Sequence, residues 1–335
     1  MPSWAVLRHS SIMGRISAIA GSRRVGALIA GLFALVLGCA TASAGVARAS
    51  IPPGEWKRPL SDIGAESPAV QAKELSFLLY CLAAVTAGRT KEAVSACSDA
   101  ITLDPSNPAG YKLRGIAYWS SSELSPALVD LNRAATLDPR DAETQGTMGA
   151  VFRARHQTSQ SVKAYSRAIA LDPLSSRWWN GRCWTRAVAR MELKVALADC
   201  TKAIALNPHS YVCYDSRGLV YLQLGRARDA ERDYSNALMR DPNVASSLFG
   251  RGVAKLWLRD QTAERDFARA MSLDAAIART FAGYGIVVDA AYLQRPPRAP
   301  EKRCSGQICP ATPAVPKKSR PAPGNDTVPV RAAQR

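Results

Sequence analysis

The side chains that most often carry catalysis are sparse in this 335-residue chain. Its three histidines are His9, near the N-terminus, and His156 and His209, which lie in segments with the composition of turns. The sequence contains no GxSxG, P-loop, HExxH or dinucleotide-binding glycine pattern, and no two cysteines have the CxxC spacing of a zinc site. We therefore expect a protein without enzymatic activity, cofactor or bound metal.

Residues suited to recognition are better represented. Residues 177–186 read RWWNGRCWTR, a dense run of tryptophan and arginine. On a helix, Arg177, Asn180 and Trp184 follow the spacing i, i+3, i+7 and share one face. Because tryptophan and arginine are the residue types most enriched at binding hot spots, this face is a candidate for peptide binding. The alternative is that Trp184 packs between structural units and the arginines are solvated, while Trp179 is expected in the core.

Prolines recur along the middle of the chain at an almost constant interval. They occupy positions 105, 139, 173, 208 and 242, which are 34 or 35 residues apart. Each closes a phrase such as Leu103-Asp104-Pro105, and a sixth phrase, at residues 273–275, ends in Ala275 instead. A fixed period of this length indicates stacked helical hairpins. Stacked hairpins expose an extended concave surface that is suited to binding.

Each repeat is expected to contain two helices separated by a short turn. In the second repeat, small and large residues recur at i, i+4 and i+7 on each helix: Tyr111, Gly115 and Tyr118, then Ala127, Leu131 and Ala134. The pattern resembles the tetratricopeptide repeat, in which an aromatic-x3-Gly-x2-aromatic helix precedes an Ala-x3-aromatic-x2-Ala helix and a proline. The fifth repeat also matches well, with Tyr214, Gly218, Tyr221, Ala230, Tyr234, Ala237 and Pro242.

The resemblance covers about residues 70–277. It implies an all-α fold, a right-handed superhelical solenoid of about six hairpins, and a C-terminal capping helix over Ile277 to Leu293. In this family the first helices of the repeats line a concave groove that binds a protein or peptide. The positions carried over as groove residues are Lys112, Trp119, Arg153, Arg177, Asn180, Trp184, Asp215 and Phe249. Their mixture of aromatic and cationic side chains favours a ligand with acidic residues.

Four cysteines occupy equivalent positions in two repeats. Cys81 and Cys183 take the place of the glycine in the first helix, and Cys97 and Cys200 face them from the second helix. Close approach of the helices at this small residue brings each pair within the Cα separation of about 4.4–6.8 Å that a disulfide requires. We expect the disulfides Cys81–Cys97 and Cys183–Cys200 in an oxidising compartment, with buried free cysteines as the alternative.

The first 49 residues have the features of a targeting segment. They hold five arginines, no acidic residue and an apolar run from Val25 to Leu37. A basic region, an apolar region and small residues, in that order, are typical of a secretory signal, here with cleavage after Ala44 or Ala49. We expect export to the periplasm of a bacterial-type cell. A membrane anchor, lipid attachment at Cys39, a twin-arginine route and a mitochondrial transit peptide are the alternatives.

Positive charge is concentrated near the C-terminus. Residues 294–335 contain nine Lys or Arg, two acidic residues and nine prolines, within a chain whose formal charge is +17. A segment of this composition is expected to be disordered, although Cys304 and Cys309 could close a small loop in it. The predicted organisation is a signal peptide at 1–49, an arm at 50–69, the solenoid at 70–293 and a basic tail at 294–335.

These features favour a non-enzymatic scaffold or adaptor that binds an envelope protein in its concave groove. The alternative is a binder of polyanions or membrane surfaces that acts through the basic tail. Export argues against nucleic acid as a partner.

Overall fold

The computed structural model describes residues 67–293, where every regular element is an α-helix, as expected for the all-α class. The chain divides after Arg140 into two compact units. The first unit contains α3 (Pro68–Thr86), α4 (Thr90–Leu103), α5 (Pro108–Ser120) and α6 (Leu124–Leu137). The second contains α7 (Ala142–Ala154), α8 (Thr158–Leu171), α9 (Ser176–Val188), α10 (Leu193–Leu206), α11 (Tyr211–Gln223), α12 (Ala227–Arg240), α13 (Ala245–Trp257), α14 (Ala263–Leu273), α15 (Ile277–Gly283) and α16 (Ala290–Leu293).

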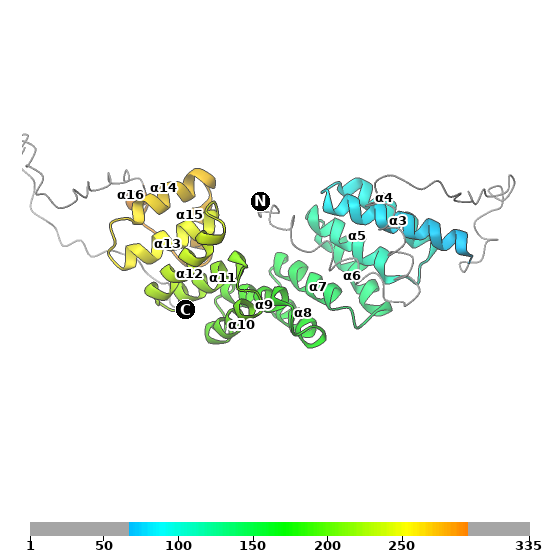
Figure 1. Cartoon of the computed structure of the whole chain (residues 1–335), viewed down its shortest axis with the longest axis horizontal. Helices are drawn as coiled ribbons and strands as arrows, with labels where there is room; N and C mark the ends of the chain where they lie inside the picture. The colour runs from blue at the N-terminus through cyan, green and yellow to red at the C-terminus, as the bar shows by residue number, and fades with distance from the viewer. Residues whose placement is uncertain (1–66, 294–335) are drawn as a thin grey trace, which may run out of the picture. The chain divides into compact units, whose positions relative to one another are not determined.

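Consecutive helices pair into hairpins within each unit (Figure 1). In the first unit α3 packs on α4 and α5 packs on α6. In the second unit α7 packs on α8, α9 on α10, α11 on α12, and α13 on α14. This is the arrangement of stacked helical hairpins that the repeat period predicts.

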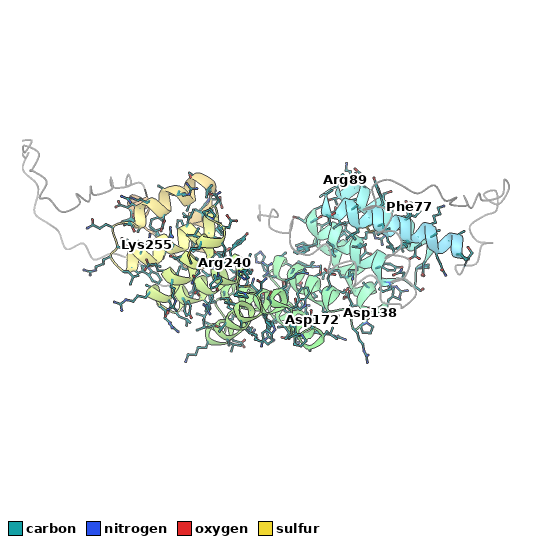
Figure 2. All side chains as sticks on the ribbon, viewed as in Figure 1. Phe77, Arg89, Asp138, Asp172, Arg240 and Lys255 are labelled. Atoms are coloured by element: carbon teal, nitrogen blue, oxygen red, sulfur yellow. A yellow bond between two sulfur atoms is a disulfide. The ribbon has the colours of Figure 1, made fainter. Side chains whose placement is uncertain are left out.

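The recurring Leu-Asp-Pro phrases form one type of turn between hairpins. The Asp or Asn side chain accepts a hydrogen bond of 2.8–3.3 Å from the backbone N–H two residues later. The accepting residues are Asp104, Asp138, Asp172, Asn207, Asp241 and Asp274, of which Asp138 and Asp172 are labelled in Figure 2. The same hydrogen bond forms at Asp274, where alanine replaces the proline, so the turn does not depend on the proline ring.

The turn inside each hairpin has a left-handed residue at an equivalent position. These residues are Gly88, Ser122, His156, Arg190, Gly225 and Arg259, with φ between 56° and 71°. A left-handed residue directly after a helix is a common way to end it. In the α9–α10 turn, Glu192 is a second left-handed residue with φ 47°. The interval from Pro173 to Pro208 is 35 residues, one more than the other intervals. The second left-handed residue accommodates this one-residue insertion in the turn.

Buried Arg–Asp pairs join the two helices of four hairpins. In each pair the arginine Nε and Nη2 donate to the two carboxylate oxygens at 2.6–2.9 Å. The pairs are Arg114–Asp130, Arg182–Asp199, Arg217–Asp233 and Arg251–Asp266. The α7–α8 hairpin has Met148 and Ala164 at the corresponding positions. Such two-point pairs fix the relative position of the two helices in addition to pairing opposite charges.

Three of these arginines also reach a neighbouring hairpin. Each donates from Nη1 to a hydroxyl on the second helix of the preceding hairpin, at 2.9–3.4 Å. The accepting residues are Ser98, Ser166 and Thr201. One side chain therefore contributes both to closing its own hairpin and to stacking it on the previous one.

Disulfides link the two helices of two hairpins that are not adjacent in the chain. Cys81–Cys97 joins α3 to α4, and Cys183–Cys200 joins α9 to α10, with Cα atoms 5.4 Å apart in both. These are the pairs that the equivalent positions in the sequence predict. Among the described cysteines Cys213 is free and buried, and burial raises the pKa of its thiol. The suggested Cys304–Cys309 loop lies outside the described residues.

Several other predicted segments also lie outside residues 67–293, namely the leader, most of the N-terminal arm and the basic tail. α3 begins at Pro68, and the Ser67 side chain accepts a hydrogen bond from the N–H of Val70 at its start. By length and composition alone α3 could cross a membrane. In the structure it buries Leu78 and Ala84 in the core that it shares with α4 and α5.

The predicted single capping helix over Ile277 to Leu293 is wrong. α15 ends at Gly283, a non-helical stretch follows from Tyr284 to Asp289, and α16 is one short turn. The break occurs at Gly285, whose φ is 79°, and the N–H of Ile286 donates to the Phe281 carbonyl at 3.0 Å. This is the hydrogen bond of a Schellman ending. The segment packs on α13 and α14, so it does cover the last hairpin, but as a bent chain.

Candidate functional site

The first helices of the hairpins in the second unit form a continuous face. α7 contacts α9, α9 contacts α11, and α11 contacts α13. Contacts of this extent do not join α8 to α10 or α10 to α12 in this unit. A stack whose first helices lie closer together than its second helices curves toward the first helices, so this face is the concave one.

Arg177, at the start of α9, is held in place on this face by an aromatic ring. Its guanidinium carbon lies 4.6 Å from the centre of the Trp178 ring. Its Nη1 lies 3.7 Å from Oε1 of Glu143 on α7, and half of the side chain remains exposed at 51%. An ion pair this long and exposed contributes about 0–1 kcal/mol. Arg177 is therefore oriented in advance, yet able to exchange Glu143 for another carboxylate.

Among the described residues, two of the buried polar atoms without a hydrogen-bond partner belong to predicted groove residues. They are Nε of Arg153 on α7 and Oδ1 of Asn180 on α9. A buried polar group without a partner costs about 1–3 kcal/mol, and such groups are uncommon in folded proteins. One is a donor and the other an acceptor, which together suit a peptide with carboxylate and N–H groups. We call Arg153, Arg177 and Asn180 the arginine stripe.

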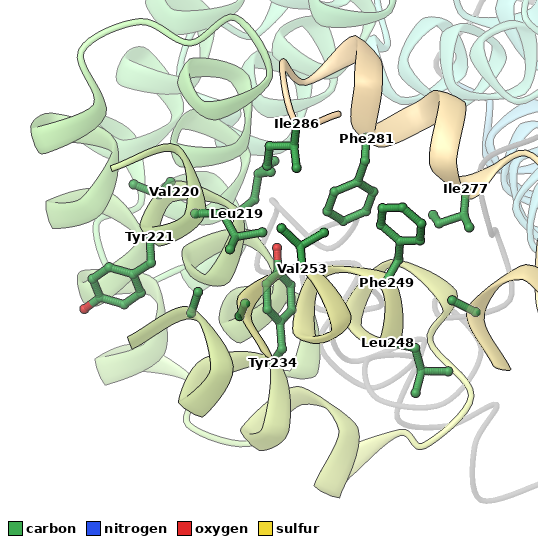
Figure 3. Packing of buried hydrophobic residues seen from close by; sticks show 14 of the residues in the cluster. Leu219, Val220, Tyr221, Tyr234, Leu248, Phe249, Val253, Ile277, Phe281 and Ile286 are labelled. Atoms are coloured by element: carbon green, nitrogen blue, oxygen red, sulfur yellow. The ribbon is translucent and has the colours of Figure 1, made fainter. Parts of the chain in front are cut away.

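Further along the concave face the predicted groove is already covered. Phe249 is only 1% exposed and packs against Phe267 and Phe281, with ring centres 5.0 and 4.8 Å apart (Figure 3). The expectation of an accessible Phe249 is therefore wrong, because Phe281 of α15 lies over it. Trp184 meets the Tyr284 ring edge-on at 5.6 Å, so it is partly covered by the same segment.

Asp215 on α11 is held by hydroxyl groups of the next hairpin. Its Oδ1 accepts hydrogen bonds from Ser246 Oγ, at 3.0 Å, and from Ser247 Oγ. Burial raises the pKa of the Asp215 carboxyl, although both hydrogen bonds act in the opposite direction. Asp215 consequently acts as a link between α11 and α13.

The remaining predicted groove residues belong to the first unit. Lys112 is buried on α5, and Trp119 is partly buried near the end of the same helix. Of the eight predicted positions, three therefore form the arginine stripe of the second unit, and Trp184, Asp215 and Phe249 are engaged within that unit. In residues 67–293 no group of three His, Cys, Asp or Glu side chains is placed to hold a metal ion.

Sequence reasoning missed two residues that shape this face. Trp178 is buried and lies against Gly146 of α7, where a Cβ atom would stand 2.1 Å from the indole ring. It thus supports Arg177 from a site that only a glycine leaves open. Tyr284 was the other omission, since the Gly-Tyr-Gly run around it carries no recognisable motif. The adjacency of Trp178 to Arg177 was the only signal available for the first.

Comparison with known proteins finds one matching repeat profile and several similar structures. The profile of the tetratricopeptide repeat matches residues 216–280. The structure of PilF from Pseudomonas aeruginosa is similar over 68% of this chain and 97% of its own, with a TM-score of 0.54 and 15% identity. A tetratricopeptide repeat protein from Parabacteroides merdae is similar over 67% of this chain and 89% of its own, with a TM-score of 0.51 and 18% identity. A chain of the APC/C hetero-tetramer Cut9–Hcn1 is similar over 61% of this chain and 42% of its own, with a TM-score of 0.54 and 16% identity.

At these identities the structural likenesses show the fold alone. The matched profile covers most of the α11–α12 hairpin, the whole α13–α14 hairpin and the start of α15, and the same turns, left-handed residues and hairpin contacts recur through the other repeats. Repeats of this kind generally act as non-catalytic scaffolds for protein–protein interaction. Residues 216–280 of this chain thus match the tetratricopeptide repeat in sequence, and the described hairpins have the fold of such repeats.

Proposed function

We propose that this protein is a non-enzymatic adaptor of the cell envelope that binds an acidic peptide segment of a partner protein on the arginine stripe. The observation that carries the proposal is the state of Arg177, which is stacked on Trp178 and still half exposed. A guanidinium that is already oriented loses little freedom when it binds a carboxylate, and its two N–H groups can do so at two points.

The unpartnered groups of Arg153 and Asn180 support the same assignment. A side-chain movement that exposes these two buried atoms would let Arg153 Nε donate to a second acidic side chain and Asn180 Oδ1 accept an N–H of the ligand backbone. Binding would then remove two existing penalties in addition to forming new contacts. An extended peptide with acidic residues meets all three requirements.

The envelope location rests on the leader and the cysteines. A basic, apolar and small-residue order at residues 1–49 is typical of exported proteins. Disulfides persist in oxidising compartments and are rare in the cytosol, and two cysteine pairs lie at bonding distance in this fold. Both observations support a mature protein that works outside the cytoplasm.

The test is peptide binding with a matched pair of ligands. An array of fluorescein-labelled peptides rich in Asp and Glu, each paired with its Asn and Gln counterpart, is titrated onto the full chain. We expect acidic members to bind, and the Arg153→Ala, Arg177→Ala double variant to bind them at least tenfold more weakly. Arg228→Ala, which removes one positive charge from an exposed position on α12, is the control for each single arginine replacement and should bind as wild type does.

Equal binding of the acidic and amide peptides, or unchanged binding by the double variant, would contradict the proposal. The alternative, an anionic surface bound by the basic tail, is separated in the same assay by deleting residues 294–335. An adaptor keeps its acidic peptide after this deletion. A protein that acts through its tail loses both the binding and its dependence on salt.

A further inference from the structure

The concave face beyond the arginine stripe is filled by the chain's own C-terminal residues. Phe281 and Ile286 point toward Leu219, Phe249 and Val253, which lie on α11 and α13 (Figure 3). Phe281 is 2% exposed and Ile286 is 4% exposed. We call Trp184, Leu219, Gln223, Phe249 and Val253 the aromatic face.

The contacts at the centre of this segment are specific as well as apolar. The Tyr284 carbonyl accepts a hydrogen bond from Gln223 Nε2 at 3.2 Å, while the same nitrogen donates to the Ala187 carbonyl at 2.8 Å. The Tyr284 and Trp184 rings are in an edge-to-face arrangement, with their centres 5.6 Å apart. A backbone group and a side chain of one residue are thus recognised by two repeats.

Gly285 makes the recognition selective. Its φ of 79° is a conformation that favours glycine. A Cβ atom at this position would stand 2.7 Å from Nη1 of Arg190, which lies in the turn enlarged by the one-residue insertion. Any other residue would have an unfavourable backbone conformation, and the Arg190 guanidinium would have to move aside for its Cβ atom. After this bend Ile286 and Val288 return to the apolar surface, whereas Val287 is 55% exposed.

We propose that the aromatic face is a second recognition site, which accepts a partner segment with the pattern aromatic-x2-aromatic-Gly-aliphatic, and that residues 281–286 occupy it as an internal ligand. The internal segment shows which chemistry the face selects: two rings, a left-handed glycine and an aliphatic side chain. A partner peptide of this pattern competes with the segment, and its apparent affinity is reduced by the fraction of molecules in which the face is open. The aromatic face shares no residue with the arginine stripe, although Tyr284 lies within electrostatic range of Arg153, and each assignment is tested with its own ligand.

The experiment compares an opened chain with the wild type. The opened chain carries Gly285→Ala, which loosens the internal segment and leaves the aromatic face intact. The probe is a fluorescein-labelled peptide with the sequence of residues 277–289. Its control is the same peptide with alanine at the position of Gly285. We expect the opened chain to bind the probe about tenfold more tightly than the wild type does. The control peptide should bind the opened chain at least tenfold more weakly than the probe.

Adding Trp184→Ala to the opened chain should abolish the gain. If Gly285→Ala lowers the helix content measured by circular dichroism, Tyr284→Ala provides the same comparison without a backbone change. Equal and weak binding of the probe by folded opened and wild-type chains would overturn the proposal. So would a dimer that forms in the wild type and is lost on Gly285→Ala, because it would assign the face to a second copy. Acidic peptides, measured on the same samples, report on the arginine stripe separately.

Discussion

At the scale of single residues, the Arg–Asp pairs enclose charges within the described part of the chain. Asp233 is completely buried, and the Arg217 side chain beside it is 15% exposed. Two hydrogen bonds of 2.6 and 2.9 Å join them. Pairs of this kind are weak evidence for net stabilisation, but the loss of one partner leaves the other charge buried alone.

Asp233→Ala is therefore expected to reduce the free energy of unfolding by about 3–5 kcal/mol. Asp229→Ala is the matched control, since its ion pairs with Arg226 and Arg232 are exposed; surface pairs contribute about 0–1 kcal/mol. Chemical denaturation followed by circular dichroism measures both variants. Similar losses in the two would show that burial of the Arg217 charge is not what makes Asp233 important.

At the scale of elements, each disulfide connects the two helices of one hairpin. The loops that they close span 16 and 17 residues of sequence. In the chain-entropy view, closing a loop of this size stabilises the folded state by about 3 kcal/mol. The bonds thus reinforce two hairpins separately and leave the stacking of repeats to side-chain packing and to the hydrogen bonds that arginine Nη1 atoms donate to hydroxyl groups of the preceding hairpin.

Reduction of the protein is expected to lower its thermal midpoint, and non-reducing peptide mapping should recover Cys81–Cys97 and Cys183–Cys200. Replacing all four of these cysteines with alanine should remove the sensitivity to reductant, because no bond is left to break. Cys213→Ala, at the buried free thiol, should leave that sensitivity in place. Peptide mapping that finds the four cysteines as thiols in protein purified without reductant would contradict the expected pairing.

The hairpins could be predicted because each one repeats the same physical requirements. Small residues at helix crossings, an Asp that accepts from the backbone and a proline after it recur every 34 or 35 residues, so their period is visible in the sequence. The cysteine pairs followed from the same alignment. The Arg–Asp pairs also recur at equivalent positions of four repeats. Taken alone, however, a residue such as Arg114 or Asp130 looks in the sequence like any charged residue on the solvated surface of a helix.

The candidate site was less predictable because it departs from the repeat. Phe249 occupies a groove position by alignment, yet it is buried by a segment that follows the last repeat and shares none of its pattern. Nothing in the sequence shows that Gly285 adopts a left-handed conformation or that Arg190 lies against it. Such contacts depend on where a non-periodic chain turns, which local spacing does not encode.

At the scale of the whole molecule, the unit that works in the cell is expected to be shorter than the encoded chain. The apolar run of the leader is followed by two small-residue sites, ending at Ala44 and Ala49. We expect the intact mass of protein recovered from the periplasm to correspond to a chain that begins at residue 45 or residue 50. A mass that includes the leader, or a lipid on Cys39, would contradict cleavage at these sites and indicate an anchored protein.

The position of the two disulfides also bears on how the protein matures if it is exported. Once the leader has been removed, the cysteines of the repeats cross the membrane in the order 81, 97, 183, 200 and 213. Joining each to the first unpaired cysteine that preceded it yields Cys81–Cys97 and then Cys183–Cys200, and leaves Cys213 to be enclosed by the fold. The native pairing thus coincides with the order of translocation. A chain of this design can be oxidised as it emerges, without a later exchange of partners by an isomerase.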